Sequence, residues 1–546
     1  MRKRGLALLL CLVICISTAF IGCGSNADKD AGSSTAGTAA TAANPAETTN
    51  FEGLTLPLTT NGETLKITTP ECFASNRSFA EGNFPIYTEG EKATGVNLEW
   101  EVIKPDYDTV IKTRLASGSD LPDIMTINAG PLISNYIDGK LFTPLSSLID
   151  ESAPNIKKFF EARPDIKKMV TYTDKEIYML PNDSNGLEAG KSSDDYINPT
   201  CLIIRNDMLK KLNMAAPQTI EDFYKYFKGV KELGMIPYVT NPGEGTKEYK
   251  IFASLYGFKI AGEGGGRIVD GLYEDNGTVK SAFYDPKFKE LLTEMNKWYS
   301  EKLFKIEKAQ DEYNSDIISG KAGAYHFNIG GIMAYIGQLK TNVPDAELAP
   351  VKVADASVGY FLGYTVITKD CKNPKLALQW LDYTFFTDKG MKDQIFGAEG
   401  VSYAIKDGVP AFTDDFKNVL HTKGFDDLYA TGAYSGMLPH VYKRDYRLIA
   451  YKTFFEGNDA IIDQAPWFGE NCYGLLPKML TTNEELDTIN KYVPDLSTYI
   501  NEMTSKFITG QESLSNYDAF LKKLDSLNIQ KVIEVQQKQL DRFNSK

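Results

Sequence analysis

Hydrophobic residues follow two alternating patterns along this chain. Thr64–Thr69 and Pro122–Ile127 are short runs rich in apolar and β-branched residues, which predict strands. Between them, Tyr107–Ser117 places its apolar residues at helical spacing. The cycle returns much later, with a β-branched run at Gly363–Thr368 and an apolar helix over Leu376–Phe386. Strands that alternate with helices predict open α/β sheets.

The first 50 residues show neither pattern. A basic start at residues 2–4 precedes a nearly unbroken apolar run, Leu6–Ile21. This layout predicts a signal peptide over residues 1–22, because the run is shorter than the roughly 20 residues that span a bilayer. Residues 24–50 consist mostly of Ala, Thr, Ser, Gly and Asn, so we expect residues 23–50 to form a flexible tether.

Cys23 stands where a secreted chain would be both cut and lipidated. Gly22-Cys23 after the apolar run resembles a bacterial lipoprotein signal, although Phe20 and Ile21 replace the usual leucine and small residue. The resemblance implies a lipid anchor on Cys23 that holds the protein at the extracytoplasmic face of the bacterial cell membrane. An ordinary secretory signal and an uncleaved membrane helix are the alternatives.

Composition excludes several classes of protein. The 546 residues carry a net charge of −13, and loss of the three basic residues at positions 2–4 would change it to −16, so we expect no nucleic-acid partner. The four cysteines beyond Cys23 and the three histidines are scattered, and the chain has no HExxH, CxxC or GxSxG motif. We therefore expect no metal, no cofactor and no enzyme activity, with the cysteines as buried hydrophobes or in one or two disulfides.

Six segments, in fixed order, resemble one family over nearly the whole mature chain. The family is that of extracellular solute-binding proteins of ABC importers, specifically the sugar-binding lipoproteins of family 1 and the LplA type. The six segments are Ala116–Ile124, Lys175–Pro181, Leu202–Leu209, Ser319–Ala324, Phe396–Tyr403 and Lys506–Gly510.

The resemblance implies a periplasmic-binding-protein-like fold of two α/β lobes, joined by a hinge with a ligand cleft between them. The N-terminal lobe would hold residues 51–182 with 357–390, and the C-terminal lobe residues 183–356 with 391–546. The protein would be a monomer that captures an oligosaccharide by hinge closure and delivers it to the permease subunits of an importer. Relatives often carry a calcium loop that Lys228–Tyr238 lacks, so we expect no calcium there.

A sugar site needs flat rings for the apolar C–H faces and polar side chains for the hydroxyls. Ligands of open α/β sheets bind beyond the carboxyl ends of the strands, so residues that follow predicted strands are the first candidates. These are Asn76, Arg77 and Asn128, together with His326, Phe327 and Asn328 after a strand expected over Gly320–Tyr325. The family resemblance adds Tyr196, Tyr256, Glu399, Tyr403 and Trp467.

Phe327 is the expected stacking platform for a sugar ring. His326 would take its place if the strand register shifted by one residue, because neighbouring strand residues point to opposite sides. Two alternative functions remain open at this point, an exported carbohydrate-active enzyme and a receptor for another solute such as a peptide or a phosphorylated molecule. Turnover of the sugar would separate the enzyme from the receptor.

Overall fold

The computed structural model places residues Thr48–Lys546 in one compact unit. Cys23, Asn76, Arg77 and Tyr196 lie outside the described residues. The described residues are 48–70, 84–104, 106–128, 132–182, 200–260, 266–353, 363–423 and 476–545, with 438, 439, 441, 443–454, 461, 463, 464 and 467.

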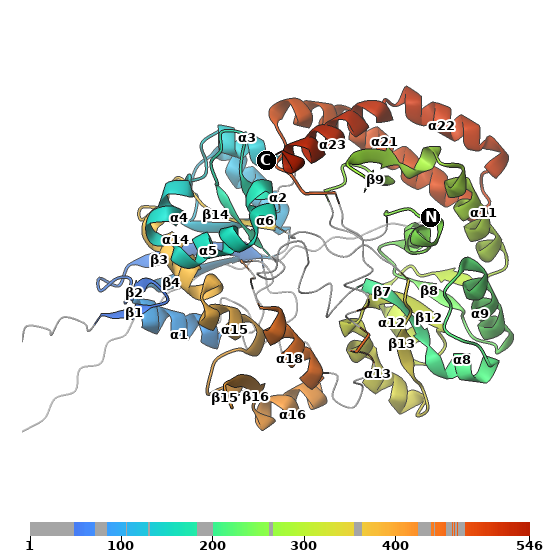
Figure 1. Ribbon diagram of the computed structural model, residues 1–546, viewed down its shortest axis with the longest axis horizontal. Helices are drawn as coiled ribbons and strands as arrows, with labels where there is room; N and C mark the ends of the chain where they lie inside the picture. Colours follow the sequence, from blue (N-terminus) through green and yellow to red (C-terminus); the bar gives the residue numbers. More distant parts are fainter. Residues whose placement is uncertain are drawn as a thin grey trace, which may run out of the picture. The chain divides into compact units, whose positions relative to one another are not determined.

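The first of two five-stranded sheets, of which β3, β4 and β14 are labelled in Figure 1, has the strand order β4-β3-β5-β14-β6. Strands β4, β3 and β5 run parallel, whereas β14 is antiparallel to both β5 and β6. The strands predicted near residues 64, 122 and 363 are all present in this sheet. Its strands are β4 (Asn97–Ile103), β3 (Thr64–Pro70), β5 (Ile124–Ile127), β14 (Gly363–Ile367) and β6 (Met179–Asn182).

Short helices pack on this sheet and share its hydrophobic core, which we call the first core. Helix α2 (Tyr107–Ser117) has the predicted bounds, and Gly118 ends it with a positive φ of 62°. The apolar helix expected over 376–386, with Pro374 at its start, does begin at Pro374 and turns π-helical at Asp382. The other helices are α1 (Pro85–Thr94), α3 (Ile133–Asp138), α4 (Ser146–Ser152), α5 (Pro154–Ala162), α6 (Pro164–Val170) and α14 (Pro374–Leu381).

The second sheet has the strand order β11-β8-β12-β7-β13. Strands β11, β8 and β12 run parallel, and β7 is antiparallel to its two neighbours β12 and β13. The strands are β11 (Phe304–Ile306), β8 (Tyr238–Thr240), β12 (Ala324–Asn328), β7 (Thr200–Arg205) and β13 (Leu348–Pro350). Helices α8 (Asn206–Leu212), α9 (Ile220–Glu232), α12 (Gln310–Ile318) and α13 (Gly330–Asn342) connect them.

The strand expected over Gly320–Tyr325 is wrong in its position. Gly320 has a left-handed φ of 75° and belongs to a turn, and the strand begins only at Ala324. A Cβ atom on Gly323 would come within 2.5 Å of Val230, so that glycine serves close packing against α9. His326 and Phe327 are therefore part of the strand rather than of a loop after it.

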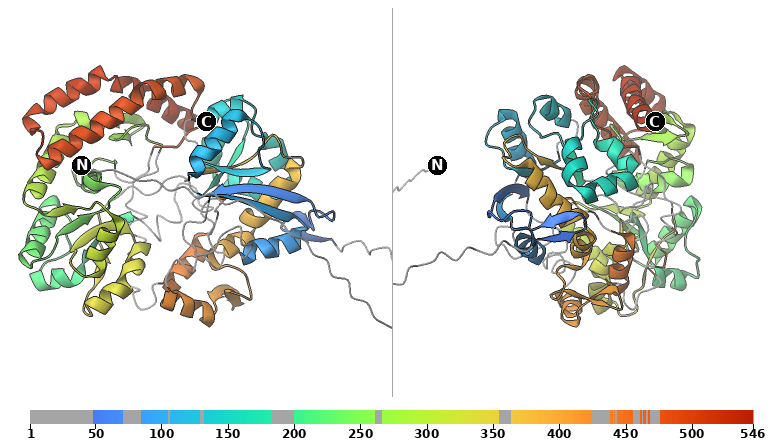
Figure 2. Two further views of the ribbon diagram at one scale, coloured as in Figure 1. Left: turned by 180° about the vertical axis from the view of Figure 1, so that it is seen from behind. Right: turned by 60° about the vertical axis from the view of Figure 1, so that its left-hand side comes forward.

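A helical layer completes the second half of the chain. Helix α11 (Pro286–Ser300) packs against α21 (Asn483–Thr509), which also packs against α23 (Ile529–Asn544), as the red C-terminal helices in Figure 2 show. Trp298 on α11 is fully buried in this second core, and Trp380 is fully buried in the first core. Both tryptophans are thus packing residues. Further elements are α10 (Tyr249–Ala253), β9 (Leu272–Asp275), β10 (Thr278–Ser281) and α22 (Tyr517–Ser526).

Residues 388–423 contain a further strand pair, which forms a hairpin. This hairpin packs through Tyr403 and Phe412 into a third core, which also includes Cys201 and Tyr325 of the second sheet. The elements are α15 (Asp388–Phe396), β15 (Tyr403–Lys406), β16 (Val409–Phe412), α16 (Asp414–Lys423) and α18 (Arg444–Phe454).

The assignment of residues 391–546 to one lobe stays a prediction, because residues in this range belong to different hydrophobic cores. Leu438, Val441 and Leu480 lie in that range but belong to the first core. Leu476 belongs to the second core, so the chain passes from one core to the other over only four residues. We call residues 476–480 the core crossing. Family-level reasoning did not predict it.

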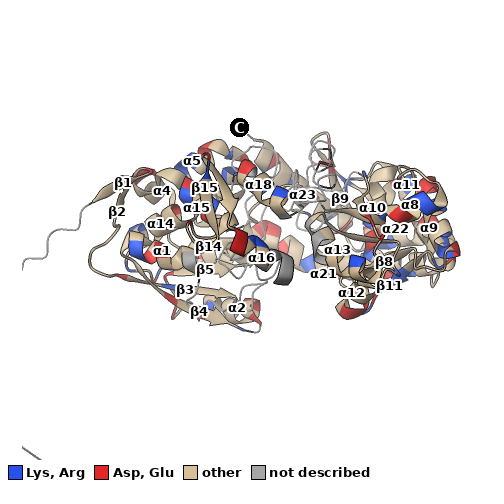
Figure 3. Ribbon diagram, turned by 90° about the horizontal axis from the view of Figure 1, so that it is seen from below, with Lys and Arg blue, Asp and Glu red and all other residues tan. Residues whose placement is uncertain are grey.

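Basic and acidic residues are interspersed along the helices (Figure 3). No helix within the described ranges is long and apolar enough to cross a membrane. Cys201 and Cys371 are both buried, which matches their predicted role as small hydrophobes. Within the same ranges, no three His, Cys, Asp or Glu residues come together as metal ligands.

Candidate functional site

The carboxyl ends of three parallel strands meet at one edge of the second sheet. Strands β11, β8 and β12 are followed or ended there by Glu307, Asn241 and Asn328. Strand β13 runs in the same direction as β12, because both are antiparallel to β7. This shared edge is where open α/β sheets place their ligands, and we call it the second edge.

His326 and Phe327 occupy the second edge on opposite faces of β12. Phe327 is half-buried, and its ring packs edge-to-face on Tyr335 of α13 at a centroid distance of 6.1 Å. The main-chain carbonyl of His326 accepts a hydrogen bond of 3.0 Å from the Tyr313 hydroxyl, which holds this part of the strand in place. The imidazole is half-exposed, and its charge acts on the buried carboxyl of Glu248.

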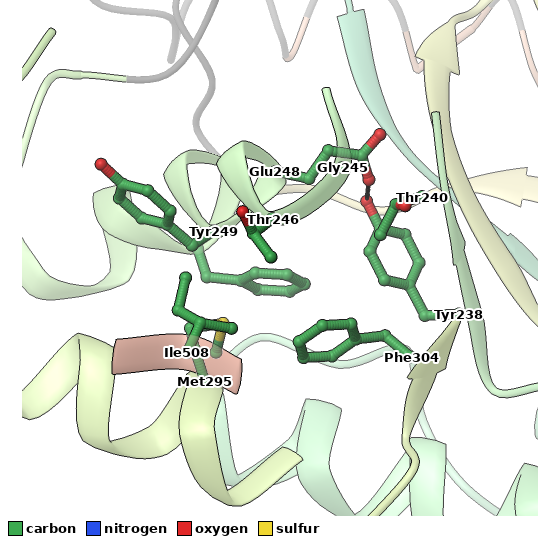
Figure 4. Close-up of a pocket in the computed structure, with 10 residues that line it drawn as sticks. Tyr238, Thr240, Gly245, Thr246, Glu248, Tyr249, Met295, Phe304 and Ile508 are labelled. Carbon is green, nitrogen blue, oxygen red and sulfur yellow. Dashed lines mark hydrogen bonds between the residues drawn. The ribbon is translucent and has the colours of Figure 1, made fainter. Parts of the chain in front are cut away.

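Glu248 is a buried acid behind this edge that sequence reasoning missed. Its carboxylate accepts a hydrogen bond from the Tyr238 hydroxyl (Figure 4) and another, at 2.5 Å, from the Asn241 N–H. Burial raises the pKa of Glu248 to about 7, opposed by the charge of His326. No sequence signal could have found it, because only the fold brings the turn 245–248 against β8.

A small cavity lies beside Glu248, between Tyr238, Thr240, Met295 and Phe304 (Figure 4). Its volume is about 10 Å³, which is room for about one water molecule. It is therefore no sugar site. A larger hollow of about 390 Å³ runs along β13 between α8 and α13, and none of the predicted ligand residues that the structure describes lines it.

Trp467 reaches the second edge from a distant part of the sequence. Its ring is half-buried against the third core, and the Lys352 Nζ lies 5.6 Å from the ring centre. Lys352 follows β13 by two residues, so it belongs to the same strand-end region as Phe327. The fold thus brings two predicted aromatic residues to one edge.

Two asparagines flank a glycine at the corresponding edge of the first sheet, which we call the first edge. Asn128 follows β5, Asn182 ends β6, and Gly363 begins β14 between them. A Cβ atom on Gly363 would come within 2.3 Å of the Asn128 Oδ1, so the amide lies across the glycine. That oxygen is buried and has no hydrogen-bond partner among the described residues. The sequence predicted Asn128 but missed Asn182 and Gly363.

Asn182 is anchored within the sheet. Its Oδ1 accepts a hydrogen bond of 2.6 Å from the Thr365 hydroxyl, and both side chains are buried. On the opposite face of β14, the Nζ of Lys478 lies 5.7 Å from the Tyr364 ring centre. Burial lowers the pKa of Lys478, which belongs to the core crossing. The first edge therefore combines amides with an aromatic residue and a lysine.

Three other predicted residues lie elsewhere. Tyr256 ends a short 3₁₀ turn and packs on the second core, where burial and the charges of Glu294 and Glu290 on α11 raise its pKa to about 12. Glu399 is exposed in the turn before β15. Tyr403 is fully buried in the third core, and its hydroxyl donates a 2.8 Å hydrogen bond to Asp393. In this conformation Tyr403 offers a ligand no surface.

The sequence pattern of bacterial extracellular solute-binding proteins matches residues 86–418, more than half of the chain. The chain belongs to this family. The solute-binding protein is 24% identical over 535 residues to the fructooligosaccharide ABC transporter substrate-binding protein FusA of Streptococcus pneumoniae, covering 91% of this chain and 93% of FusA. It is also 27% identical over 309 residues to the lipoprotein LipO of Bacillus subtilis, covering 49% of this chain and 58% of LipO.

Solved structures share the fold over most of the chain. The alginate-binding protein AlgQ2 without calcium superposes with a TM-score of 0.69 at 25% identity, covering 89% of this chain and 99% of AlgQ2. FusA in complex with kestose superposes with a TM-score of 0.66 at 19% identity, covering 88% and 99%. The predicted fold class and family are thereby confirmed. Since its relatives are substrate-binding components of ABC transporters, the protein is not an enzyme.

Proposed function

We propose that this protein captures an oligosaccharide outside the cell membrane and delivers it to the permease of an ABC importer. The end-to-end similarity to FusA, which covers more than nine-tenths of both chains, is the observation that carries this proposal. FusA is named for fructooligosaccharides and AlgQ2 for alginate, so both relatives bind carbohydrate. A ligand of the same class fits the aromatic and amide residues at the two strand edges.

The ligand contacts would come from both edges. Asn128 would contribute polar contacts from the first sheet, and Phe327 or His326 would supply the stacking surface from the second. Trp467 and Asn328 belong to the same edge as Phe327. Asn76, Arg77, Tyr196, Tyr256 and Glu399 stay predictions from sequence. The burial of Tyr403 supports a packing role for this residue instead.

The two sheets would close around the ligand by a hinge, with lobes bounded near residues 182, 356 and 390. The core crossing is a further connection between the two sheets. It supports closure by rotation of two halves that stay folded, and not by unfolding of either half. Saturating ligand should then reduce the radius of gyration in solution scattering. An unchanged radius would contradict closure while leaving binding itself intact.

A thermal-shift screen against a panel of neutral and acidic oligosaccharides, with kestose included, tests the function. A sugar present at 100 times its Kd should stabilise the folded protein by roughly 2.7 kcal/mol. Peptides and sugar phosphates serve as the comparison ligands. If only these shift the melting temperature, the carbohydrate proposal fails. Chromatography of the recovered sugar should show it unchanged.

A further inference from the structure

The last turn of α23 contacts both halves of the molecule. Most of this helix belongs to the second core, through Val532 and Leu540. Its final apolar residue, Phe543, packs instead against the first core. Helix α6 of the first half and α23 are in direct contact. One helix therefore contacts the cores of both halves.

A single lysine of the first half holds this helix end. The Lys168 Nζ on α6 donates hydrogen bonds of 2.9 Å to the main-chain carbonyls of both Phe543 and Ser545. The same ammonium lies 5.8 Å from the centre of the Phe543 ring. The last carbonyls of a helix carry partial negative charge and lack helical partners, so an ammonium is a favourable group to bind them.

The helix end is also tied to the core crossing. The Arg542 guanidinium donates to the Leu480 carbonyl at 3.0 Å and pairs with the buried carboxylate of Glu485 at 2.5 Å. Farther back on α23, the Gln536 amide donates to the Gly266 carbonyl at 3.0 Å. The Gly266 N–H in turn donates to the Leu476 carbonyl at 2.8 Å. Both ends of the crossing are thus linked to α23.

A second bridge lies at the start of α21. The Asn483 Nδ2 donates to Asp138 at 2.6 Å, and Asp138 also accepts a 3.2 Å hydrogen bond from Tyr172. Asp138 and Tyr172 both pack with the first half, whereas α21 belongs mainly to the second core. Two independent polar bridges therefore flank the crossing.

We propose that the end of α23, Phe543–Ser545, together with Lys168 forms a pivot that restricts how the two halves move. Contacts beside a crossing segment are displaced little by a rotation about it, so the pivot can persist while the halves open and close. Without the pivot, the core crossing would have to limit the twisting and separation of the two halves with fewer supporting contacts. The unliganded protein would then sample more relative orientations, and ligand binding would have to suppress them. This inference does not depend on which solute is bound.

The test compares Lys168→Ala with a matched control, Lys167→Ala. Lys167 is the preceding residue on α6 and is also exposed, but it has no hydrogen bond to the end of α23 among those described. Lys168→Ala should increase the radius of gyration of the unliganded protein and speed hydrogen exchange of the 476–480 amides several-fold. Lys168→Arg keeps a cationic donor and should restore both values. Equal behaviour of Lys168→Ala and Lys167→Ala would overturn the proposal.

Ligand binding provides a second measurement, with kestose or whichever sugar of the panel shifts the parent protein. Lys168→Ala should weaken binding about threefold to tenfold through a less favourable entropy, although the described partners of Lys168 are only Phe543 and Ser545. Tighter sugar binding by Lys168→Ala would overturn the pivot proposal, because it would mean that the contact of Lys168 with the end of α23 favours the unliganded state. If no sugar binds the parent protein, the proposed function fails, whereas scattering and exchange still decide the pivot.

Discussion

At the scale of single residues, Gly363 shows how an absent side chain can shape a site. Its backbone does not adopt the left-handed conformation, so glycine is needed for space alone. The Asn128 amide occupies that space and lies across the first edge. Replacement of Gly363 should therefore displace the Asn128 amide before it disturbs the pairing of strands in the sheet.

We expect Gly363→Ala to weaken sugar binding by roughly tenfold, because the methyl group displaces the Asn128 amide by more than ordinary packing allows. Calorimetric titration measures the loss, with a melting curve alongside it. Gly337→Ala is the matched control, since a Cβ atom there has open space on an exposed face of α13. Unchanged affinity in Gly363→Ala would remove Asn128 from the ligand site.

Phe327 and His326 offer a paired test of the second edge. Because they point to opposite faces of β12, only one of them can stack on a given sugar ring. We expect Phe327→Ala to weaken binding by about 5- to 150-fold, the range of a lost stacking ring of about 1–3 kcal/mol. His326→Ala should then bind nearly as the parent does. If both variants bind normally, this edge does not hold the sugar, and an early-melting Phe327→Ala would mark the ring as a packing residue.

At the scale of elements, the turn 245–248 places the titratable carboxyl group of Glu248 behind β8. The pKa of Glu248 is raised to about 7 by burial, so the folded protein binds a proton there that the unfolded chain releases near pH 4.5. Stability must therefore fall as pH rises through this interval, since the folded state then holds more protons than the unfolded state. Asp382, buried against the start of α5, has a pKa of about 7 for the same reason and adds to the same trend.

Glu248→Gln should flatten this dependence. The parent protein is expected to lose up to about 3 kcal/mol of unfolding free energy at this site between pH 4.5 and pH 7.5. The glutamine variant, which cannot ionise, should lose less over the same range. Urea unfolding at both pH values measures the difference, and Glu399→Gln serves as an exposed control. Parallel pH profiles for the parent and Glu248→Gln would show that Glu248 is already ionised in the fold.

At the scale of the whole molecule, attachment and capture are separate properties. If Cys23 carries a lipid, Cys23→Ala should release the protein from the membrane fraction of cells without changing its melting temperature or its affinity for sugar. Membrane fractionation followed by immunoblotting measures this. Full retention of Cys23→Ala in the membrane would instead favour an uncleaved apolar segment at residues 6–21.

Local patterns in the sequence predicted the elements well where one physical rule dominates. Apolar and β-branched runs marked β3, β5 and β14, and helical spacing marked α2 to the residue. Arg205 and Asp207, two residues apart, form a buried ion pair at 2.7 Å. Such features depend on near neighbours in the chain, so the sequence contains their cause.

The site depended on contacts that the sequence does not display. The strand at Ala324–Asn328 was misplaced, because small residues that seemed to build it serve a turn and close packing against α9. Asn182 and Gly363 meet Asn128 only through pairing of strands that are far apart in the chain. Glu248 is perturbed only because the fold buries it beside Tyr238.

The sequence by itself determined the alternation of strands and helices, the exclusion of metal and nucleophile motifs, and the family, since these follow from periodicity, composition and ordered local motifs. Tertiary structure alone decided which side chains share an edge, which carboxyls lose water, and how α23 and Lys168 join the two halves. The reason is physical. Burial and pairing between distant segments arise from the packing of the whole chain, and no short stretch of it contains that information.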